Sequence, residues 1–214
     1  MDGAATATEA QRRYMVEKHL KNRGIRDARV LEAMGRIPRE LFVPERYHHA
    51  AYSDEPIPIG CGQTISQPYI TALMVQVLEL KGTEKVLEVG AGSGYHAAVL
   101  GTLAAQVIAL AEMASRTLER SGCGANVRVV CADGSLGYRE LSPYDAISVA
   151  AAAPEIPPKL IKQLADSGRL VIPLGSLDEQ ELVVVTKSSG EISSRVAALC
   201  RFVPLRGGEG WKLR

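Results

Sequence analysis

The chain has 214 residues, of which 46% are hydrophobic and 23% charged, and its 25 basic and 24 acidic side chains leave a net charge of +1. That length is enough for one soluble domain, with or without a small appendage, which buries about 70% of its unfolded surface without disulfides or a structural metal. The balanced charge argues against a broad nucleic-acid-binding face, and the hydrophobic content argues against intrinsic disorder.

Two short helices and a long loop are expected in the first part of the chain. Residues 8–23 have the pattern of an amphipathic helix that Gly24 ends, and residues 27–36 form a second helix with Asp27 as its cap. Proline and glycine crowd residues 44–67, so we expect a loop there, and a loop of that length in a compact domain is typical of substrate contact. A helical run follows at residues 69–80.

From Glu84 onward, strands and helices alternate. The strands are short apolar runs typical of parallel strands buried on both faces: KVLEV, QVIALA, VRVVC, YDAISVA and RLVIPL. Helices are expected at residues 95–105 and 157–165, and residues 181–203 have the pattern of a hairpin that turns at Ser188-Ser189-Gly190.

The expected fold class is therefore α/β, with a doubly wound, mostly parallel, Rossmann-like sheet, an antiparallel C-terminal hairpin and a small helical N-terminal extension. We expect residues 1–80 to form a helical cap and substrate loop, packed on a main domain of residues 81–214.

The sharpest local signal is the string E-x-G-x-G-x-G that begins at Glu88, between the first of these strands and a helix. Gly90, Gly92 and Gly94 let the backbone turn tightly and approach a ligand closely, although such a turn can also be a purely structural connection. Two neighbours favour a nucleotide site. Glu112 at the end of the second strand is placed to hold ribose hydroxyls, and Asp133-Gly134 follows the third strand, where an adenine would lie.

The spacing also bears on which nucleotide is bound. Tyr95 stands where a dinucleotide fingerprint G-x-G-x-x-G needs its third glycine. Glu88 would repel a pyrophosphate and suits a cationic, amine-bearing ligand better. The string resembles motif I of the class I methyltransferases, in which this acid recognises the amino-acid end of the cofactor. The resemblance implies S-adenosyl-L-methionine as the cofactor.

A longer string points to a narrower family. Residues 58–68 read PIGCGQTISQP, which resembles the P-I-G-x-G-Q-T-I-S-x-P hallmark of the protein-L-isoaspartate O-methyltransferases. The likeness covers nearly the whole chain and continues through VLEVGAGSGYHAAVL, CADGSLGY, SPYDAISVAAAAP, LIKQLADSGRLVIPLGS and FVPLRGGEGW. It implies methyl transfer from S-adenosylmethionine to the free α-carboxylate of L-isoaspartyl residues in damaged peptides and proteins, whose ester then collapses to a succinimide and begins repair.

The resemblance assigns an active-site role to Ser66, whose hydroxyl would orient the substrate carboxylate without carrying charge. Ser66 is equally a candidate N-cap for the helix that follows it. Gln63 and Thr64 either line the same pocket or stabilise the loop. Ala151, after the fourth strand, and Val203, in the C-terminal string, are the further substrate-binding candidates.

The chemistry needs few ionisable groups. A carboxylate with a pKa of about 4 is already ionised at neutral pH, so no general base, triad or metal is required. We therefore interpret His96 as a packing or surface residue, and Asp54 and Glu55 as turn and surface charges.

Composition also sets expectations about location and partners. The N-terminus lacks the order of a signal peptide, and no apolar run approaches the roughly 20 residues of a membrane span. Cys61, Cys123, Cys131 and Cys200 form no C-x-x-C pair, so a zinc site is not expected. We expect a cytoplasmic monomer with reduced thiols that binds isoaspartyl peptides and proteins and has no nucleic-acid, membrane or metal partner.

One departure from the family pattern leaves an alternative open. Between Glu112 and Asn126 the chain is about six residues shorter than the family, so the expected helix, residues 115–121, has little more than two turns and relies on packing. The alternative is an S-adenosylmethionine-binding protein of the same fold with impaired or altered catalysis. The 58–68 string disfavours a small-molecule or nucleic-acid methyltransferase, and Tyr95 disfavours a hydride-transferring dehydrogenase.

Overall fold

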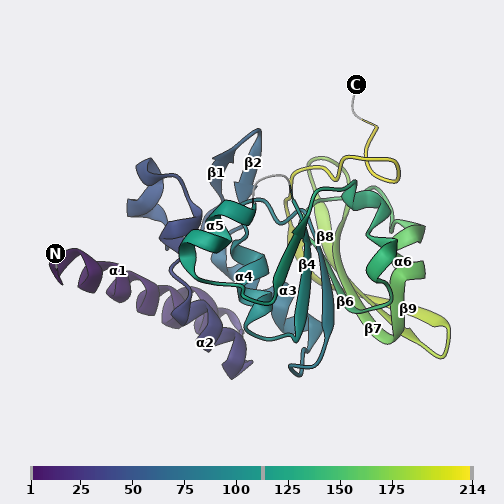
Figure 1. The fold of residues 1–214 in the computed structure, drawn as a ribbon, viewed down its shortest axis with the longest axis horizontal. Coiled ribbons are helices and arrows are strands. Elements are labelled where there is room, and N and C mark those ends of the chain that lie inside the picture. The colour runs from purple at the N-terminus through teal and green to yellow at the C-terminus, as the bar shows by residue number, and fades with distance from the viewer. Residues whose placement is uncertain (1, 112–113, 213–214) are drawn as a thin grey trace.

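The computed structural model describes residues 2–111 and 114–212, and a seven-stranded sheet in the order β5-β4-β3-β6-β7-β8-β9 forms its centre (Figure 1). The strands are β3 (Lys85–Val89), β4 (Gln106–Leu110), β5 (Val127–Val130), β6 (Tyr144–Val149), β7 (Leu164–Gly175), β8 (Gln180–Ser188) and β9 (Glu191–Cys200). Pairs from β5 to β7 are parallel, whereas β7–β8 and β8–β9 are antiparallel. This confirms the doubly wound α/β class and its antiparallel C-terminal hairpin.

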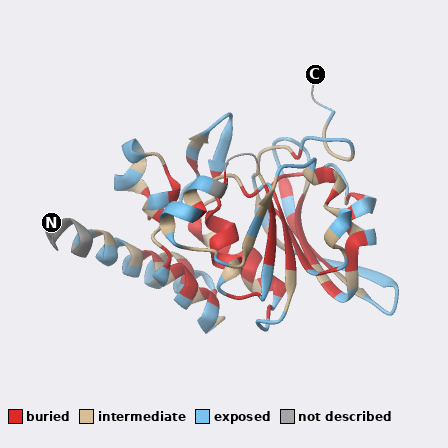
Figure 2. Ribbon diagram, viewed as in Figure 1, coloured by how far each residue is buried: buried red, intermediate tan, exposed pale blue. Residues whose placement is uncertain are grey.

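Alternating side chains of the sheet enter two hydrophobic cores, one on each face. On β3, Val86 packs with the core on the face that carries α2 (Ala28–Arg36), α3 (Pro68–Leu78), α4 (Tyr95–Gly101) and α5 (Ala114–Ser121). The next residue, Leu87, packs with the core on the other face, beside α6 (Pro158–Gln163). Burial on both faces explains why the central parallel strands β3, β4 and β6 are mostly apolar (Figure 2).

The first N-terminal helix ends where predicted but begins at Asp2 rather than at residue 8, and the second follows its predicted boundaries closely. α1 (Asp2–Tyr14) continues through a π-helical segment, Met15–Leu20, and a short 3₁₀ turn to Gly24, whose φ of 99° ends the helix. Asp27 caps α2, because its carboxylate accepts a hydrogen bond from the Arg29 backbone N–H at 2.9 Å. The first core includes Met15 and Leu20 together with sheet residues, so this segment shares a hydrophobic core with the sheet.

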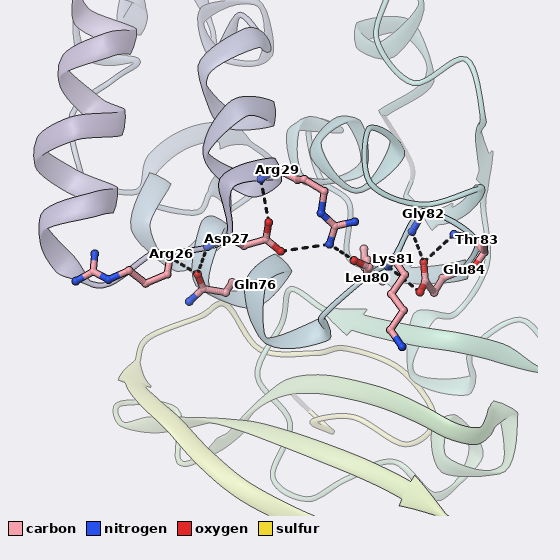
Figure 3. A network of polar contacts seen from close by, with 9 residues as sticks. All are labelled: Arg26, Asp27, Arg29, Gln76, Leu80, Lys81, Gly82, Thr83 and Glu84. Atoms are coloured by element: carbon pink, nitrogen blue, oxygen red, sulfur yellow. Dashed lines mark hydrogen bonds and ion pairs between the residues drawn. The ribbon is translucent and has the colours of Figure 1, made fainter.

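A network of polar contacts joins the start of α2 to α3 and to the beginning of β3 (Figure 3). Gln76 of α3 accepts hydrogen bonds from the backbone N–H groups of Arg26 and Asp27, at 2.6 and 3.0 Å. The Arg29 guanidinium donates to the Leu80 carbonyl. Glu84 accepts from the three backbone N–H groups that precede it, those of residues 81–83. The N-terminus of α2 is thus held to α3 and to the turn that leads into β3.

The expectation that residues 44–67 form a loop was wrong. They contain a 3₁₀ segment, Glu45–Ala50, and a hairpin of β1 (Ile57–Gly60) and β2 (Gln63–Ile65). Ile57 and Ile65 pair across the hairpin and are both buried, and the two turn residues, Cys61 and Gly62, have φ values of 50° and 69°. Both strands belong to an isolated pair, where proline is tolerated, so proline and glycine conceal the strand pattern in the sequence.

Two predicted helices are shorter than expected. α4 ends at Gly101 rather than at residue 105, and α6 ends at Gln163 rather than at residue 165. β7 begins directly at Leu164 and extends through Ser167 and Gly168. A register shift in the β6–β7 pairing, between Tyr144 and Ala146, accommodates this early start.

Candidate functional site

The glycine loop lies at the carboxyl ends of β3, β4 and β6. Gly90, Gly92 and Gly94 have φ values of 84°, 51° and 91°, conformations that favour glycine. The Gly90 and Ala91 N–H groups both donate to the Leu110 carbonyl at 3.2 Å, and the Ala150 N–H donates to the Val89 carbonyl. These bonds fix the loop at the edge of the sheet where ligands of such folds bind.

The β1–β2 hairpin and α5 both pack closely on this loop. A Cβ atom at Gly92 would lie 3.1 Å from Ile59 Cδ1 of β1, and a Cβ atom at Gly94 would lie 3.0 Å from Leu118 Cγ of α5. The hallmark hairpin predicted to contact substrate therefore lies directly against the predicted cofactor loop, although the two are distant in sequence.

A cavity of about 370 Å³ opens where the hairpin, the sheet edge and the C-terminal segment meet. Seven of the predicted site residues line it: Gln63, Thr64, Gly90, Gly92, Gly134, Ala151 and Val203. The other lining residues were not among the predicted site residues: Cys61, Gly62, Val89, Leu110, Ala111, Ala132, Ala150, Pro204, Leu205 and Arg206. The hairpin turn and Arg206 are thus the parts of this cavity that sequence reasoning missed.

A second, smaller cavity of about 30 Å³ adjoins the first and shares Thr64, Gly90 and Gly92 with it. Ser66 and Glu88 line this smaller cavity. Glu88 is fully buried, and neither of its carboxylate oxygens has a hydrogen-bond partner among the described residues. Burial raises the pKa of Glu88 to about 8.

These features fit the predicted cofactor. An unpartnered buried carboxylate beside a glycine cradle is a site for a cationic, hydrogen-bonding group, which the ammonium of S-adenosylmethionine provides. Gly134 lies so close to Val89 that a Cβ atom there would be 2.6 Å from Val89 Cγ1, so the chain passes tightly over the sheet at the predicted adenine position.

Ser66 is not the N-cap of α3. The N-cap position is Gln67, and the Tyr69 backbone N–H donates to Asp54 Oδ1 at 2.9 Å. Asp54 also pairs with Arg23, so the interpretation of Asp54 as a simple turn charge was wrong: it caps α3. The Ser66 hydroxyl makes no hydrogen bond within the described part of the chain, so it is free to contact a substrate.

A buried arginine holds the Ser66 backbone. Arg39 is fully buried, and its guanidinium donates to the Ser66 carbonyl at 2.7 Å and to the Ala51 carbonyl at 2.8 Å. It also stacks over the Tyr95 ring, 4.7 Å from the ring centroid. Burial lowers the pKa of Arg39 from its usual value. Arg39 therefore connects the segment that precedes α3 to Tyr95 of α4. Its hydrogen bond to the Ser66 carbonyl fixes the backbone at that residue.

Asp133 contacts the C-terminal segment. Its carboxylate accepts from Ser135 N and Ser135 Oγ at 2.9 and 2.7 Å, and from Gly208 N at 2.9 Å. Burial alone would raise the pKa of Asp133, but these hydrogen bonds outweigh it and hold the pKa below its usual value. Asp133 thus remains ionised and fastens the loop that closes one side of the cavity.

The remaining predicted residues differ in placement. Gly94 starts α4 behind the cavity rather than lining it, and Glu112 lies outside the described residues. His96 is 8% exposed, and its Nε2 lies 3.4 Å from Ser148 Oγ. Burial lowers the pKa of His96 to about 4, so the imidazole is neutral at physiological pH and packs between α4 and β6.

The sheet, the glycine loop and the buried acid together define a nucleotide-cofactor site of the class I methyltransferase type. A family model described as protein-L-isoaspartate(D-aspartate) O-methyltransferase matches residues 10–210. The chain belongs to this family.

Relatives and solved structures agree with this assignment. The chain is 53% identical over 208 residues to protein-L-isoaspartate O-methyltransferase 2 of Marinobacter nauticus, covering 94% of each chain. It is 50% identical over 212 residues to the protein-L-isoaspartate O-methyltransferase of Koribacter versatilis, covering 96% of this chain and 95% of that one.

Among solved structures, one protein-L-isoaspartate O-methyltransferase has a TM-score of 0.80 and 31% identity, covering 92% of this chain and 66% of that one. A Plasmodium falciparum chain described as a protein-L-isoaspartate O-methyltransferase, in complex with S-adenosyl-L-homocysteine, has a TM-score of 0.77 and 29% identity. The match covers 91% of this chain and 98% of that one.

Proposed function

We propose that this protein transfers the methyl group of S-adenosylmethionine to the free α-carboxylate of L-isoaspartyl residues in damaged peptides and proteins, and so initiates their repair through a succinimide. The observation that carries the proposal is the contact between hairpin and glycine loop. Ile59 of the hallmark hairpin approaches Gly92, and residues from both segments line one cavity. A substrate at the hairpin and a cofactor at the loop would therefore meet.

We assign the cofactor to the carboxyl edge of β3, β4 and β5. Glu88 would hold its amino-acid end against the glycine loop, Glu112 its ribose, and Asp133 and Gly134 its adenine. When bound, S-adenosylmethionine supplies a methyl group on a sulfonium centre that is itself the activated electrophile. Glu88 accepts the ammonium best as a carboxylate, so cofactor binding is expected to favour its ionised form.

The chain's own task is to place the substrate carboxylate. That group is already ionised at neutral pH, so the neutral imidazole of His96 is not needed as a base. Ser66 would donate its hydroxyl to the carboxylate, with its backbone held by Arg39. Gln63, Thr64, Ala151 and Val203 would line the remaining path and exclude water. Alignment and desolvation of this kind contribute on the order of 7 to 11 kcal/mol to a barrier.

The alternative, a cofactor-binding protein with impaired or altered catalysis, rests on the short helix α5. Its eight residues, Ala114–Ser121, still pack on the glycine loop through Ala114 and Leu118, 3.3 and 3.0 Å from a Cβ atom placed at Gly94. A cavity of about 390 Å³ lies between α5 and β5, lined by residues such as Cys123 and Val127. This cavity lies apart from the hairpin, which favours an active enzyme.

The location and the partners stay proposals of the same kind. None of the helices in the described parts of the chain combines the length and apolar character that a membrane span needs. The four cysteines are unpaired, which supports the proposed cytoplasmic location with reduced thiols. A monomeric state and the lack of a nucleic-acid partner remain predictions.

Labelled S-adenosylmethionine and two peptides of identical sequence, one with isoaspartate and one with aspartate, test the function. We expect label in the isoaspartyl peptide and little in the aspartyl peptide. Equal labelling would contradict the substrate assignment. Calorimetric binding of S-adenosylmethionine without turnover on any isoaspartyl peptide would instead support the alternative.

A further inference from the structure

Arg206 is the one charged side chain among the described residues that line the main cavity. It is exposed, and within the described parts of the chain its guanidinium has no ion pair or hydrogen bond. It lines the main cavity but not the smaller cavity that contains Ser66 and Glu88. This cation therefore lies at the solvent side of the site, away from the residues assigned to the reacting groups.

The backbone that carries Arg206 is firmly held. The Leu205 N–H donates to the Ala152 carbonyl at 2.7 Å, and the Trp211 N–H donates to the Leu205 carbonyl at 2.7 Å. Farther along, the Glu209 N–H donates to Ser135 Oγ at 3.0 Å. A cation on an anchored loop costs less entropy to bring into contact with a ligand than one on a mobile segment.

The acidic side chains that contact this loop have other partners. Asp133 is held by Ser135 and by the Gly208 N–H. Glu209 pairs with Lys159 at 3.4 Å and also accepts from the Lys159 backbone N–H at 3.2 Å. Neither of these acids neutralises Arg206, so among the described residues the rim of the cavity carries a positive charge without a partner, which an anionic ligand would complete.

The cofactor is not the ligand that this charge suits, because S-adenosylmethionine carries two positive charges against one negative. Direct pairing with the reacting carboxylate is also unfavourable, since a bound cation weakens a nucleophile. We propose that Arg206 selects isoaspartyl substrates that carry a second carboxylate, an aspartate or glutamate side chain, next to the damaged residue. This inference rests on the proposed function and adds a specificity determinant to it.

Peptides with Glu, Gln or Lys on either side of isoaspartate test the proposal in steady-state methylation. The wild-type protein is expected to have a KM about threefold to fivefold lower for a Glu neighbour than for Gln, with similar kcat, as for a partly exposed ion pair. High salt should reduce the preference. Arg206→Gln should abolish it, and Arg206→Glu should make Lys the favoured neighbour.

Arg201→Gln is the matched control, because it removes one exposed positive charge, outside the cavity, on the same C-terminal segment. It should keep the preference. Cofactor affinity measured by calorimetry should be unchanged in both glutamine variants, and loss of affinity only in Arg206→Gln would overturn the proposal by assigning Arg206 to the cofactor.

Two further outcomes would also overturn it: an Arg206→Gln variant that loses efficiency equally on all peptides, or a wild-type protein indifferent to neighbouring charge. Fluorescence anisotropy of labelled peptides measures the same preference in binding. If no peptide is methylated, the catalytic function fails, while the anisotropy still decides the role of Arg206.

Discussion

Glu88→Gln is the substitution for which the structure predicts the clearest effect. The wild-type carboxyl group is fully buried at the end of β3, has no hydrogen-bond partner among the described residues, and titrates near pH 8. Glutamine has nearly the same shape and cannot ionise. The substitution therefore removes the cost of a buried charge and little else, so the two proteins should differ mainly in how their stability depends on pH.

The sign follows from the pKa values. The folded pKa, about 8, lies above the ordinary value of 4.5, so the folded state holds the Glu88 proton in a range where the unfolded chain has lost it. The stability that this proton contributes is fully present below pH 4.5 and is lost as the pH rises toward 8. At 1.36 kcal/mol per pH unit, the wild-type protein loses about 3 kcal/mol by pH 7 relative to Glu88→Gln, and about 5 kcal/mol above pH 8.

Urea unfolding of the cofactor-free proteins between pH 5 and pH 8 measures this difference, because titration of all other groups cancels between the two. The free energy of unfolding of Glu88→Gln minus that of wild type should rise by about 1 kcal/mol per pH unit over this range, with equal m values. A difference that does not change with pH, or that falls as pH rises, would refute the assignment of a high pKa to Glu88.

Cofactor binding provides a second readout of the same group. If the Glu88 carboxylate receives the ammonium of S-adenosylmethionine, binding to wild type releases a proton. The ionised fraction at a pKa of 8 rises about 50-fold between pH 6 and pH 8, so affinity should rise by up to that factor. The Glu88→Gln protein should bind weakly and lack this component, and its own pH profile corrects for titration of the cofactor amine.

Three other substitutions test the site and its supports. Ser66→Ala should lower kcat about tenfold or more while leaving S-adenosylmethionine affinity unchanged in calorimetry; unaltered kcat would remove Ser66 from the reaction. Gly94→Ala should lower stability by about 1 to 3 kcal/mol in thermal unfolding, because φ is 91° and the added Cβ meets Leu118 at 3.0 Å; an unchanged Tm would argue against this loop geometry. Asp54→Ala should cost about 1 to 2 kcal/mol in urea unfolding through loss of the α3 cap, whereas an unchanged midpoint would reject that role.

The parts of the fold that depend on local pattern were predictable. The central parallel strands are apolar because both faces are buried, and Gly90, Gly92 and Gly94 occur where the backbone needs positive φ. The hairpin at residues 57–65 was not predicted. Of the hairpin residues only Ile57 and Ile65 are buried, and the proline and glycine residues between them are more typical of a loop.

The parts that depend on contacts between distant segments could not be predicted. The cap of α3 comes from Asp54, which lies 15 residues before the Tyr69 N–H that donates to it. By sequence, Ser66 was an equal candidate because it lies just before the helix. Arg206 is an ordinary surface residue by sequence, and only the return of the C-terminal segment to Ala152 brings it to the cavity. Arg39 likewise gains its role from the Ser66 carbonyl, 27 residues away.

Asp133, the acid that we assign to the adenine, also holds the C-terminal segment. Its Oδ2 holds the Gly208 N–H, 75 residues away, and a Cβ atom at Gly207 would lie 2.0 Å from its Oδ1, so only glycine permits this approach. The loop fastened in this way belongs to the segment that brings Val203 and Arg206 to the cavity. The acid assigned to the adenine therefore also positions the residues assigned to the peptide. The choice among peptide substrates should therefore depend on the hydrogen bonds that join Asp133 to Ser135 and Gly208, even though Asp133 itself does not line the main cavity.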